Sequence, residues 1–184
     1  MPISTIGQNG LNAPLSLTTP ALGTPSSLVL TNATGLARAA LPTGSVLQVV
    51  QSTSSSSIAS SAGTFTDTNL SASITPLSAS NKILVMVTQS IYVAGGGADN
   101  GGVVQILRNA TGVFNDGGSN AFYINASGVS QTALTNYVAM NLLDSPSSTS
   151  SVTYKTQMKS ENGSTITAQI NSNTSTITLM EIAA

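Results

Sequence analysis

The chain has 184 residues, with five Lys or Arg, six Asp or Glu, a net charge of −1, no Cys and no His. Charged residues make up 6% of it, against roughly 25% in an average soluble domain, so its polar surface must come mainly from 29 Ser, 24 Thr and 15 Asn. This composition excludes disulfides, thiolate chemistry, His-dependent catalysis and His or Cys metal sites. The few, scattered basic residues also argue against nucleic-acid binding, which needs several cations to neutralise phosphates.

Residues 1–43 are predicted to form an extended arm. They hold five of the seven prolines and one charged residue, Arg38. Proline fixes φ, removes a backbone donor and pushes the preceding residue toward extended geometry. A disordered linker fits the same composition. The segment has neither the basic region nor the apolar run of a signal peptide, and no stretch of the chain nears the ~20 apolar residues that span a bilayer, so we expect cytoplasmic synthesis and no membrane insertion.

Residues 44–184 are predicted to form one β domain. Strands are expected at 45–52, 64–67 and 70–75, with a loop or edge strand at 53–62. The segment 82–94 begins apolar on both faces, which is typical of a central strand. The glycine-rich segment 95–102 is expected to be a loop.

The second half of the domain continues in the same manner. Strands are expected at 103–109, 121–125 and 132–143, with turns at 116–118 and 145–147. In 151–160 apolar and polar residues alternate, which predicts a strand with one buried face. Asn162-Gly163 supplies the residues of a type I′ turn, after which residues 165–170 are expected to form the second strand of a hairpin. The last strand, 176–182, is apolar on both faces, which suits a sheet covered by a second sheet or by neighbouring subunits.

These nine to eleven strands, with no convincing helical period, predict an all-β fold. We expect an antiparallel, jelly-roll-like β-sandwich at 44–184 behind the arm at 1–43.

No catalytic constellation stands out. A pair of carboxylates remains formally open, but Asp99, Asp116, Asp144 and Glu161 all adjoin turn residues, where a carboxylate usually caps a turn or faces solvent. Oxygen ligands around Asp99, Asn100 and Asp116 could hold Ca²⁺, yet their spacing matches no EF-hand loop. We therefore expect no catalytic residues, no metal and no cofactor.

Aromatic side chains offer one weak binding hypothesis. Most of them lie inside strand patterns and are expected to pack in the core. Phe114 and Tyr123, together with Asn120, flank the 116–118 turn and are the candidates for contact with a glycan.

Two parts of the chain resemble bacteriophage proteins. The arm sequence TPALGTPSSLVLTNATGL (19–36) looks like linker segments of phage tail fibres. The body is similar to a family of virion proteins of marine and cyanobacterial phages, through GTFTDTNLSASITP (63–76), SNKILVMV (80–87) and STITLMEI (175–182). The resemblance implies a jelly-roll fibre or knob domain, often trimeric, attached to the particle by its N-terminal arm. It transfers no catalytic residue.

The resulting expectation is a non-enzymatic, homotrimeric virion protein of the fibre type, docked on other tail or capsid proteins through residues 1–43. The chain is short and lacks repeated shaft segments, which leaves a capsid decoration protein as the alternative. A glycan-binding tip that attaches to a host surface is the third interpretation. Uncharged Asn and Ser side chains could form hydrogen bonds with a sugar, although the need for a polar surface explains these residues equally well.

Overall fold

The computed structural model of the chain describes residues 41–95, 99–115, 122–125 and 132–184. The chain divides into two units at Leu36/Ala37, and all described residues belong to the second. Most of the predicted arm therefore lies outside the described residues, as does the predicted 116–118 turn.

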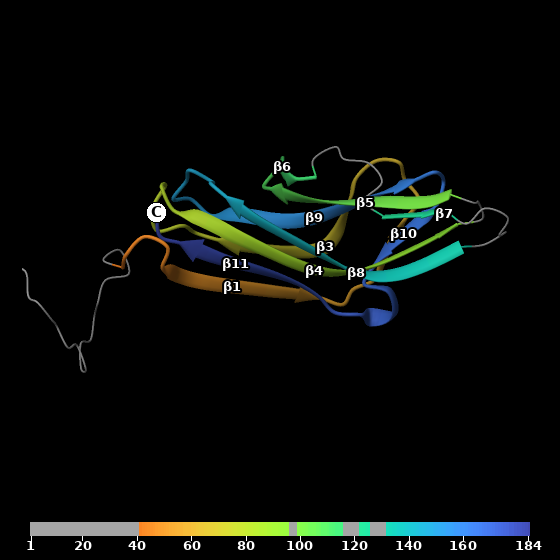
Figure 1. Cartoon of the computed structure of the whole chain (residues 1–184), viewed down its shortest axis with the longest axis horizontal. Coiled ribbons are helices and arrows are strands. Elements are labelled where there is room, and N and C mark those ends of the chain that lie inside the picture. Colours follow the sequence, from red (N-terminus) through yellow and green to blue (C-terminus); the bar gives the residue numbers. More distant parts are fainter. Residues whose placement is uncertain (1–40, 96–98, 116–121, 126–131) are drawn as a thin grey trace, which may run out of the picture. The chain divides into compact units, whose positions relative to one another are not determined.

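The described part is almost entirely β-structure, with one short 3₁₀ turn after the tenth strand (Figure 1). The strands are β1 (Val46–Ser54), β2 (Ile58–Ser60), β3 (Thr66–Ile74), β4 (Lys82–Gly95), β5 (Asp99–Arg108), β6 (Thr111–Phe114), β7 (Phe122–Asn125), β8 (Thr132–Asp144), β9 (Val152–Glu161), β10 (Thr165–Ala168) and β11 (Ser175–Ile182).

The strands form two antiparallel sheets. Sheet A has the order β1-β11-β4-β10-β2, with β8 along the other side of β4; sheet B has the order β3-β9-β5-β6, with β7 also paired to β5. Along the chain, β1, β3, β4 and β5 alternate between the sheets, and β8, β9 and β11 alternate again. A sandwich of two antiparallel sheets wound in this way is jelly-roll-like, so the predicted fold class is confirmed.

The inner faces of the two sheets bury one hydrophobic core. Its largest members with almost no exposed surface are Leu70, Ile83, Ile91, Ile106, Tyr154, Met158, Ile166, Ile177 and Leu179. In β9 every second residue from Val152 to Ser160 is buried, which confirms the predicted alternation. Burial of this kind contributes about 25 cal/mol per Å² of apolar surface, and it fixes which face of each strand points inward.

Several local predictions need correction. The two strands expected at 64–67 and 70–75 are one strand, β3, whose pairing with β9 shifts register between Asp67 and Ser71. Asn69 has φ of 62° inside this bulge, a conformation that Asn tolerates better than most residues. The expected 95–102 loop is shorter, because β5 begins at Asp99. Strand β6 was not expected, since its four residues are too few to show a period.

The Asn162-Gly163 turn has the predicted positive φ values, 55° and 72°. The strands on either side of it nevertheless belong to different sheets, because β9 lies in sheet B while β10 pairs with β4 and β2 in sheet A. Ser164 supports this crossing, since its hydroxyl donates to the carbonyl of Gly101 at 2.6 Å. The expected hairpin is therefore a link between the two sheets.

Candidate functional site

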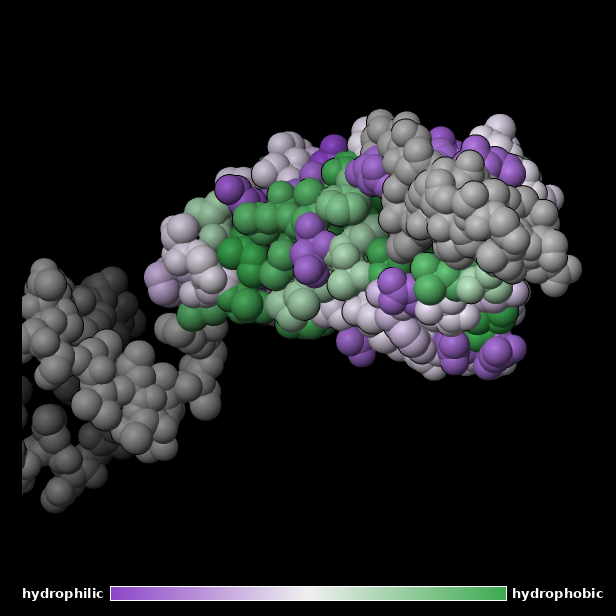
Figure 2. Space-filling model, turned by 45° about the vertical axis from the view of Figure 1, so that its right-hand side comes forward, coloured by the Kyte–Doolittle hydropathy of each residue, from purple (hydrophilic) through white to green (hydrophobic). Residues whose placement is uncertain are grey.

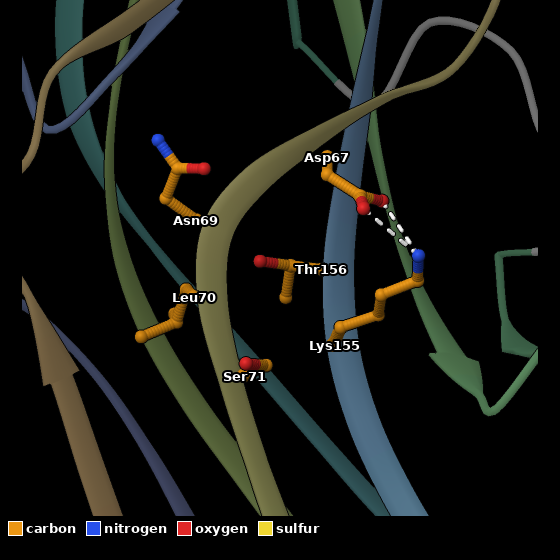
Figure 3. Close-up of a pocket in the computed structure, with 6 residues that line it drawn as sticks. All are labelled: Asp67, Asn69, Leu70, Ser71, Lys155 and Thr156. Carbon is orange, nitrogen blue, oxygen red and sulfur yellow. Dashed lines mark hydrogen bonds and ion pairs between the residues drawn. The ribbon is translucent and has the colours of Figure 1, made fainter.

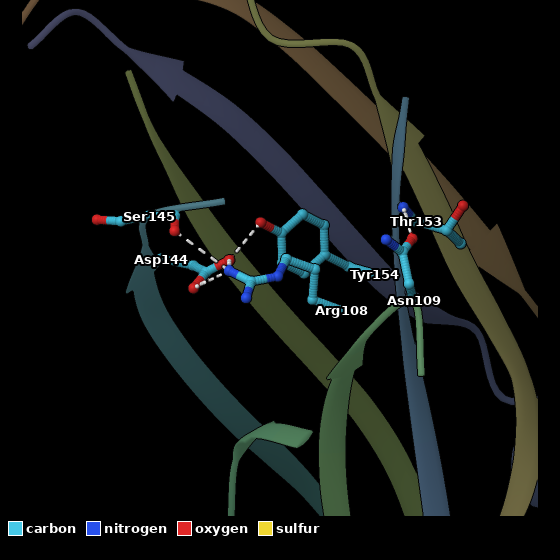
Figure 4. A network of polar contacts seen from close by, with 6 residues as sticks. All are labelled: Arg108, Asn109, Asp144, Ser145, Thr153 and Tyr154. Atoms are coloured by element: carbon cyan, nitrogen blue, oxygen red, sulfur yellow. Dashed lines mark hydrogen bonds and ion pairs between the residues drawn. The ribbon is translucent and has the colours of Figure 1, made fainter. Parts of the chain in front are cut away.

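A charged cluster ties sheet A to sheet B (Figure 4). Arg108 of β5 donates to both carboxylate oxygens of Asp144, at the end of β8, at 2.9 and 2.8 Å. The hydroxyl of Tyr154, from β9, donates to the same carboxylate at 2.6 Å. Burial, together with this hydrogen bond and the charge of Asp144, raises the pKa of Tyr154 well above its usual 10.0. The phenol therefore stays protonated at physiological pH, and the cluster acts as a clamp between the sheets.

A second carboxylate, Glu181, lies near the C-terminal end of β11 and is completely buried. It accepts hydrogen bonds of 2.6 Å from the Gln48 amide, the Leu77 backbone N–H and the Asn81 amide. Hydrogen bonds from several donors can stabilise a buried carboxylate. The contacts join β1, β11 and the segment between β3 and β4, so Glu181 holds together the end of the fold where β1 begins.

The bulge in β3 creates a pocket of about 280 Å³ on the outside of sheet B (Figure 3). Six residues line it: Asp67, Asn69, Leu70, Ser71, Lys155 and Thr156. Figure 3 shows Asp67 and Lys155 facing each other on one side of the β3 ribbon, with Asn69 on the other side. Sequence reasoning missed this pocket because the bulge breaks the period-two pattern at Thr68-Asn69.

The ion pair in this pocket is well satisfied. Lys155 and Gln157 donate to Asp67 at 2.9 and 2.7 Å. Partial burial acts to raise the pKa of Asp67, but the hydrogen bonds from Lys155 and Gln157 and the charge of Lys155 outweigh it and hold the pKa below the ordinary 3.8. Asp67 is therefore a stable anion and a poor proton donor near neutral pH.

Behind the bulge, polar side chains enter the core. Thr68, Gln89 and Thr156 are completely buried; the Gln89 amide donates to the Thr68 hydroxyl at 2.8 Å, and the Thr68 and Thr156 hydroxyls bond to each other. Thr156 occupies a core position on β9, between Tyr154 and Met158. This cluster fixes the bulge of β3 against β9 and β4.

The predicted glycan-contact residues are only partly described. Phe114 is half-buried in β6 and packs against the hydrophobic core, so its ring contributes to the core. Tyr123 lies in β7, whose backbone pairs with Gly101 of β5, while its side chain and all of Asn120 lie outside the described residues. The predicted contact set stays a prediction, because two of its three side chains lie outside the described residues.

The possible Ca²⁺ ligands give a similar result. Asn100 is buried, with 1% of its surface exposed, and its side chain packs so closely on Gly95 that a Cβ there would lie 1.9 Å from Oδ1. The side chain of Asp99 and all of Asp116 lie outside the described residues. Within the described ranges no group of three or more acidic, His or Cys side chains is placed to hold a metal ion.

The outer face of sheet A is the largest candidate site. Four adjacent strands, β1, β11, β4 and β8, place apolar side chains on it, and Figure 2 shows a broad hydrophobic area, coloured green and broken by few hydrophilic residues. From the register and the exposed fractions we assign to this face an apolar patch of Val46, Val49, Leu84, Met86, Leu143, Met180 and Ile182. Val49 and Leu143 expose 56% and 52% of their surface.

Part of this signal was present in the sequence. The segments that form β4 and β11 are apolar on both faces, and this pattern predicts that both faces of their sheet are covered. Sheet B covers the inner side, while no described residue covers the apolar patch. The sequence could not reveal that β1 and β8 extend the same face, because that depends on which strands are neighbours.

No protein-family model matches the sequence, and no curated protein is significantly similar to it. Among the described residues, no helix is long and apolar enough to cross a membrane.

Proposed function

We propose that this chain is a non-enzymatic structural protein of a bacteriophage particle. It is a homotrimeric, fibre-type subunit that docks on other virion proteins through residues 1–43 and projects its β-sandwich outward. The observation that carries the proposal is the apolar patch on sheet A. The described residues leave it open to water, and exposed patches of this kind mark surfaces that are covered in an assembly. The resemblance of the arm and body to phage fibre proteins supplies the kind of assembly.

The described carboxylates support a structural role. Asp144 is bound by Arg108 and Tyr154, Asp67 by Lys155 and Gln157, and Glu181 by neutral donors. Glu161 lies 3.5 Å from Lys159. General acid–base catalysis needs a proton-transfer group that can reach a substrate. Asp144, Asp67 and Glu181 instead join strands to one another, while the Glu161–Lys159 pair lies within β9.

The particle location has two candidates. A fibre-type subunit sits on the tail, whereas a capsid decoration protein lies on the shell and is held there by its arm. The jelly roll and the apolar patch suit both, and the fibre-like arm sequence favours the tail. A glycan-binding tip would need residues 116–121, which lie outside the described residues.

Gold-labelled antibodies against the β-sandwich, applied to intact particles of the phage that carries this gene, test the proposal. We expect label on the tail. Label spread over the shell would contradict the fibre hypothesis and favour a capsid decoration protein. If purified particles show neither label nor peptides of this chain, the virion role is overturned.

A further inference from the structure

We propose that the apolar patch on the outer face of sheet A is the surface through which copies of this chain bind one another. This inference rests on the proposed function, since it names the partner that covers the patch: the neighbouring subunits of the trimer. The polar outer face that β3 and β9 form in sheet B would then remain in contact with water.

The centre of the patch is a continuous row of four apolar side chains. Backbone pairing places Val49 of β1 beside Met180 of β11, Met180 beside Leu84 of β4, and Leu84 beside Leu143 of β8. The neighbouring row begins with the pair Val46 and Ile182. Side chains that are neighbours across a sheet form one surface. The patch is therefore contiguous and crosses four strands.

The size of this face suits a subunit interface. The seven paired positions of β4 with β11 extend about 24 Å, and four strands span about 19 Å. With the part of the β4–β8 ladder that continues to Ala94 and Ala133, the flat area reaches about 650 Å². This is the area of the whole face, including its Thr, Ser and Asn positions, and it approaches the roughly 800 Å² that a stable interface buries per partner.

Charge favours an identical copy as the partner. The described side chains of this face include one charged group, Lys82, which pairs with Ile182 at the margin of the patch. The remaining positions are apolar or carry uncharged groups, such as Thr88, Thr178 and Asn141. A face of this kind offers little to attract a charged partner and little to repel a second copy. Interfaces between identical subunits are also the more apolar class.

The position of the patch fits three arms that share one docking point. The described chain enters the sandwich at Leu41 and ends at Ala184, and the Gly44 N–H donates to the Ala183 carbonyl at 2.8 Å. Val46 and Ile182, in the patch, lie next to this contact. Copies that meet through the patch around a threefold axis therefore bring the bases of their arms close together.

The solution mass of the full-length chain and of three variants, measured by light scattering at several concentrations, tests the inference. Met86→Lys and Leu143→Lys each place a charge in the patch, at positions exposed in the single chain. Ser73→Lys adds the same charge on the exposed outer side of β3 in sheet B and is the matched control. We expect three times the monomer mass for the wild type and Ser73→Lys, and the monomer mass for both patch variants, with unchanged circular dichroism.

The possible results separate the two proposals. A trimeric wild type with trimeric patch variants overturns the interface and leaves the proposed trimer standing. A monomeric wild type at every concentration overturns both the interface and the trimer, and points to the arm of the same chain as a cover for the patch.

A second measurement avoids any dependence on lysine variants that fail to fold. The chain has no Cys, so Leu143→Cys and Ser73→Cys each introduce a single thiol that iodoacetamide can label. We expect alkylation at position 143 to be at least about tenfold slower than at position 73 in the trimer. Equal rates in a trimer would overturn the interface.

Discussion

The outer faces of the two sheets differ, although both are formed by alternate residues of long antiparallel strands. On sheet B, β3 and β9 present Ser71, Ser73, Thr153, Lys155 and Gln157, and most of these residues have a hydrogen-bonding partner in the neighbouring strand. On sheet A, the equivalent positions of β1, β11, β4 and β8 carry the apolar patch. Strands β3 and β9 therefore have the apolar-in, polar-out pattern of a sheet that faces water, whereas β5 places the buried residues Val103 and Leu107 on the same face of sheet B. Sheet A has apolar residues on both sides, as in a sheet that is covered twice.

The contrast separates what holds one chain together from the surface through which we propose that it binds other copies. The core between the sheets and the Arg108–Asp144 clamp are complete in a single chain. The described residues leave the apolar patch exposed, so it gains hydrophobic free energy only when something else covers it. Changes to the core, to the clamp and to the exposed ion pair should therefore have effects of decreasing size on the folded chain.

The largest effect is expected from a pair of adjacent residues in β11. Leu179 is completely buried in the core, whereas Met180 belongs to the patch. Leu179→Ala should lower the free energy of unfolding by about 2–5 kcal/mol. Met180→Ala should cost the single chain less than about 1 kcal/mol and otherwise weaken association. Urea unfolding at several protein concentrations distinguishes them, because only the Met180→Ala deficit should depend on concentration. Equal, concentration-independent losses would mean that the patch is already packed within one chain.

A smaller effect is expected from removing one charge of the clamp. The side chain of Asp144 is 12% exposed and accepts from both Arg108 and Tyr154. Asp144→Asn leaves the Arg108 guanidinium beside a neutral amide, and we expect the free energy of unfolding to fall by about 1–3 kcal/mol. The matched change Asp67→Asn, in an ion pair whose carboxylate side chain is 53% exposed, should cost about 0–1 kcal/mol. Urea midpoints at neutral pH measure both, and equal costs would contradict the role of the clamp between the sheets.

The smallest effect is the acid dependence that Asp67 contributes. Its folded-state pKa lies below 3.8 because of Lys155 and Gln157. A lowered pKa means that the stabilisation is present above 3.8 and is lost as the pH falls through the folded-state pKa. Urea midpoints measured from about pH 5 to about pH 2 should fall slightly more steeply for the wild type than for Asp67→Asn. A steeper fall for the variant would show that the sign is wrong.

The fold class was predictable because its signals are local. Period-two patterns and apolar runs at β1, β4, β9 and β11 reflect which side of each strand is buried, and each strand records that in its own residues. The predicted boundaries of β4 and β11 differ from the observed ones by one residue. Strand β6 escaped notice because four residues cannot establish a period.

The candidate site was less predictable because it depends on residues that are distant in the chain. The row from Val49 to Leu143 joins four segments, and no property of one segment reveals its neighbours in the sheet. The β3 pocket depends on a single residue, Asn69, in a left-handed conformation. The residues predicted for glycan contact flank one predicted turn; only the side chain of Phe114 is described among them, and it packs against the core.

The sequence by itself determined an all-β domain with strands near their observed positions, because burial and backbone preference act within each strand. Only the tertiary structure decided that β9 and β10 separate into different sheets, that Asp144 meets Arg108 and Tyr154, and that four strands align their apolar residues on one open face. The physical reason is that strand pairing is a long-range choice. It is settled by how all the faces pack together, and no single strand encodes it.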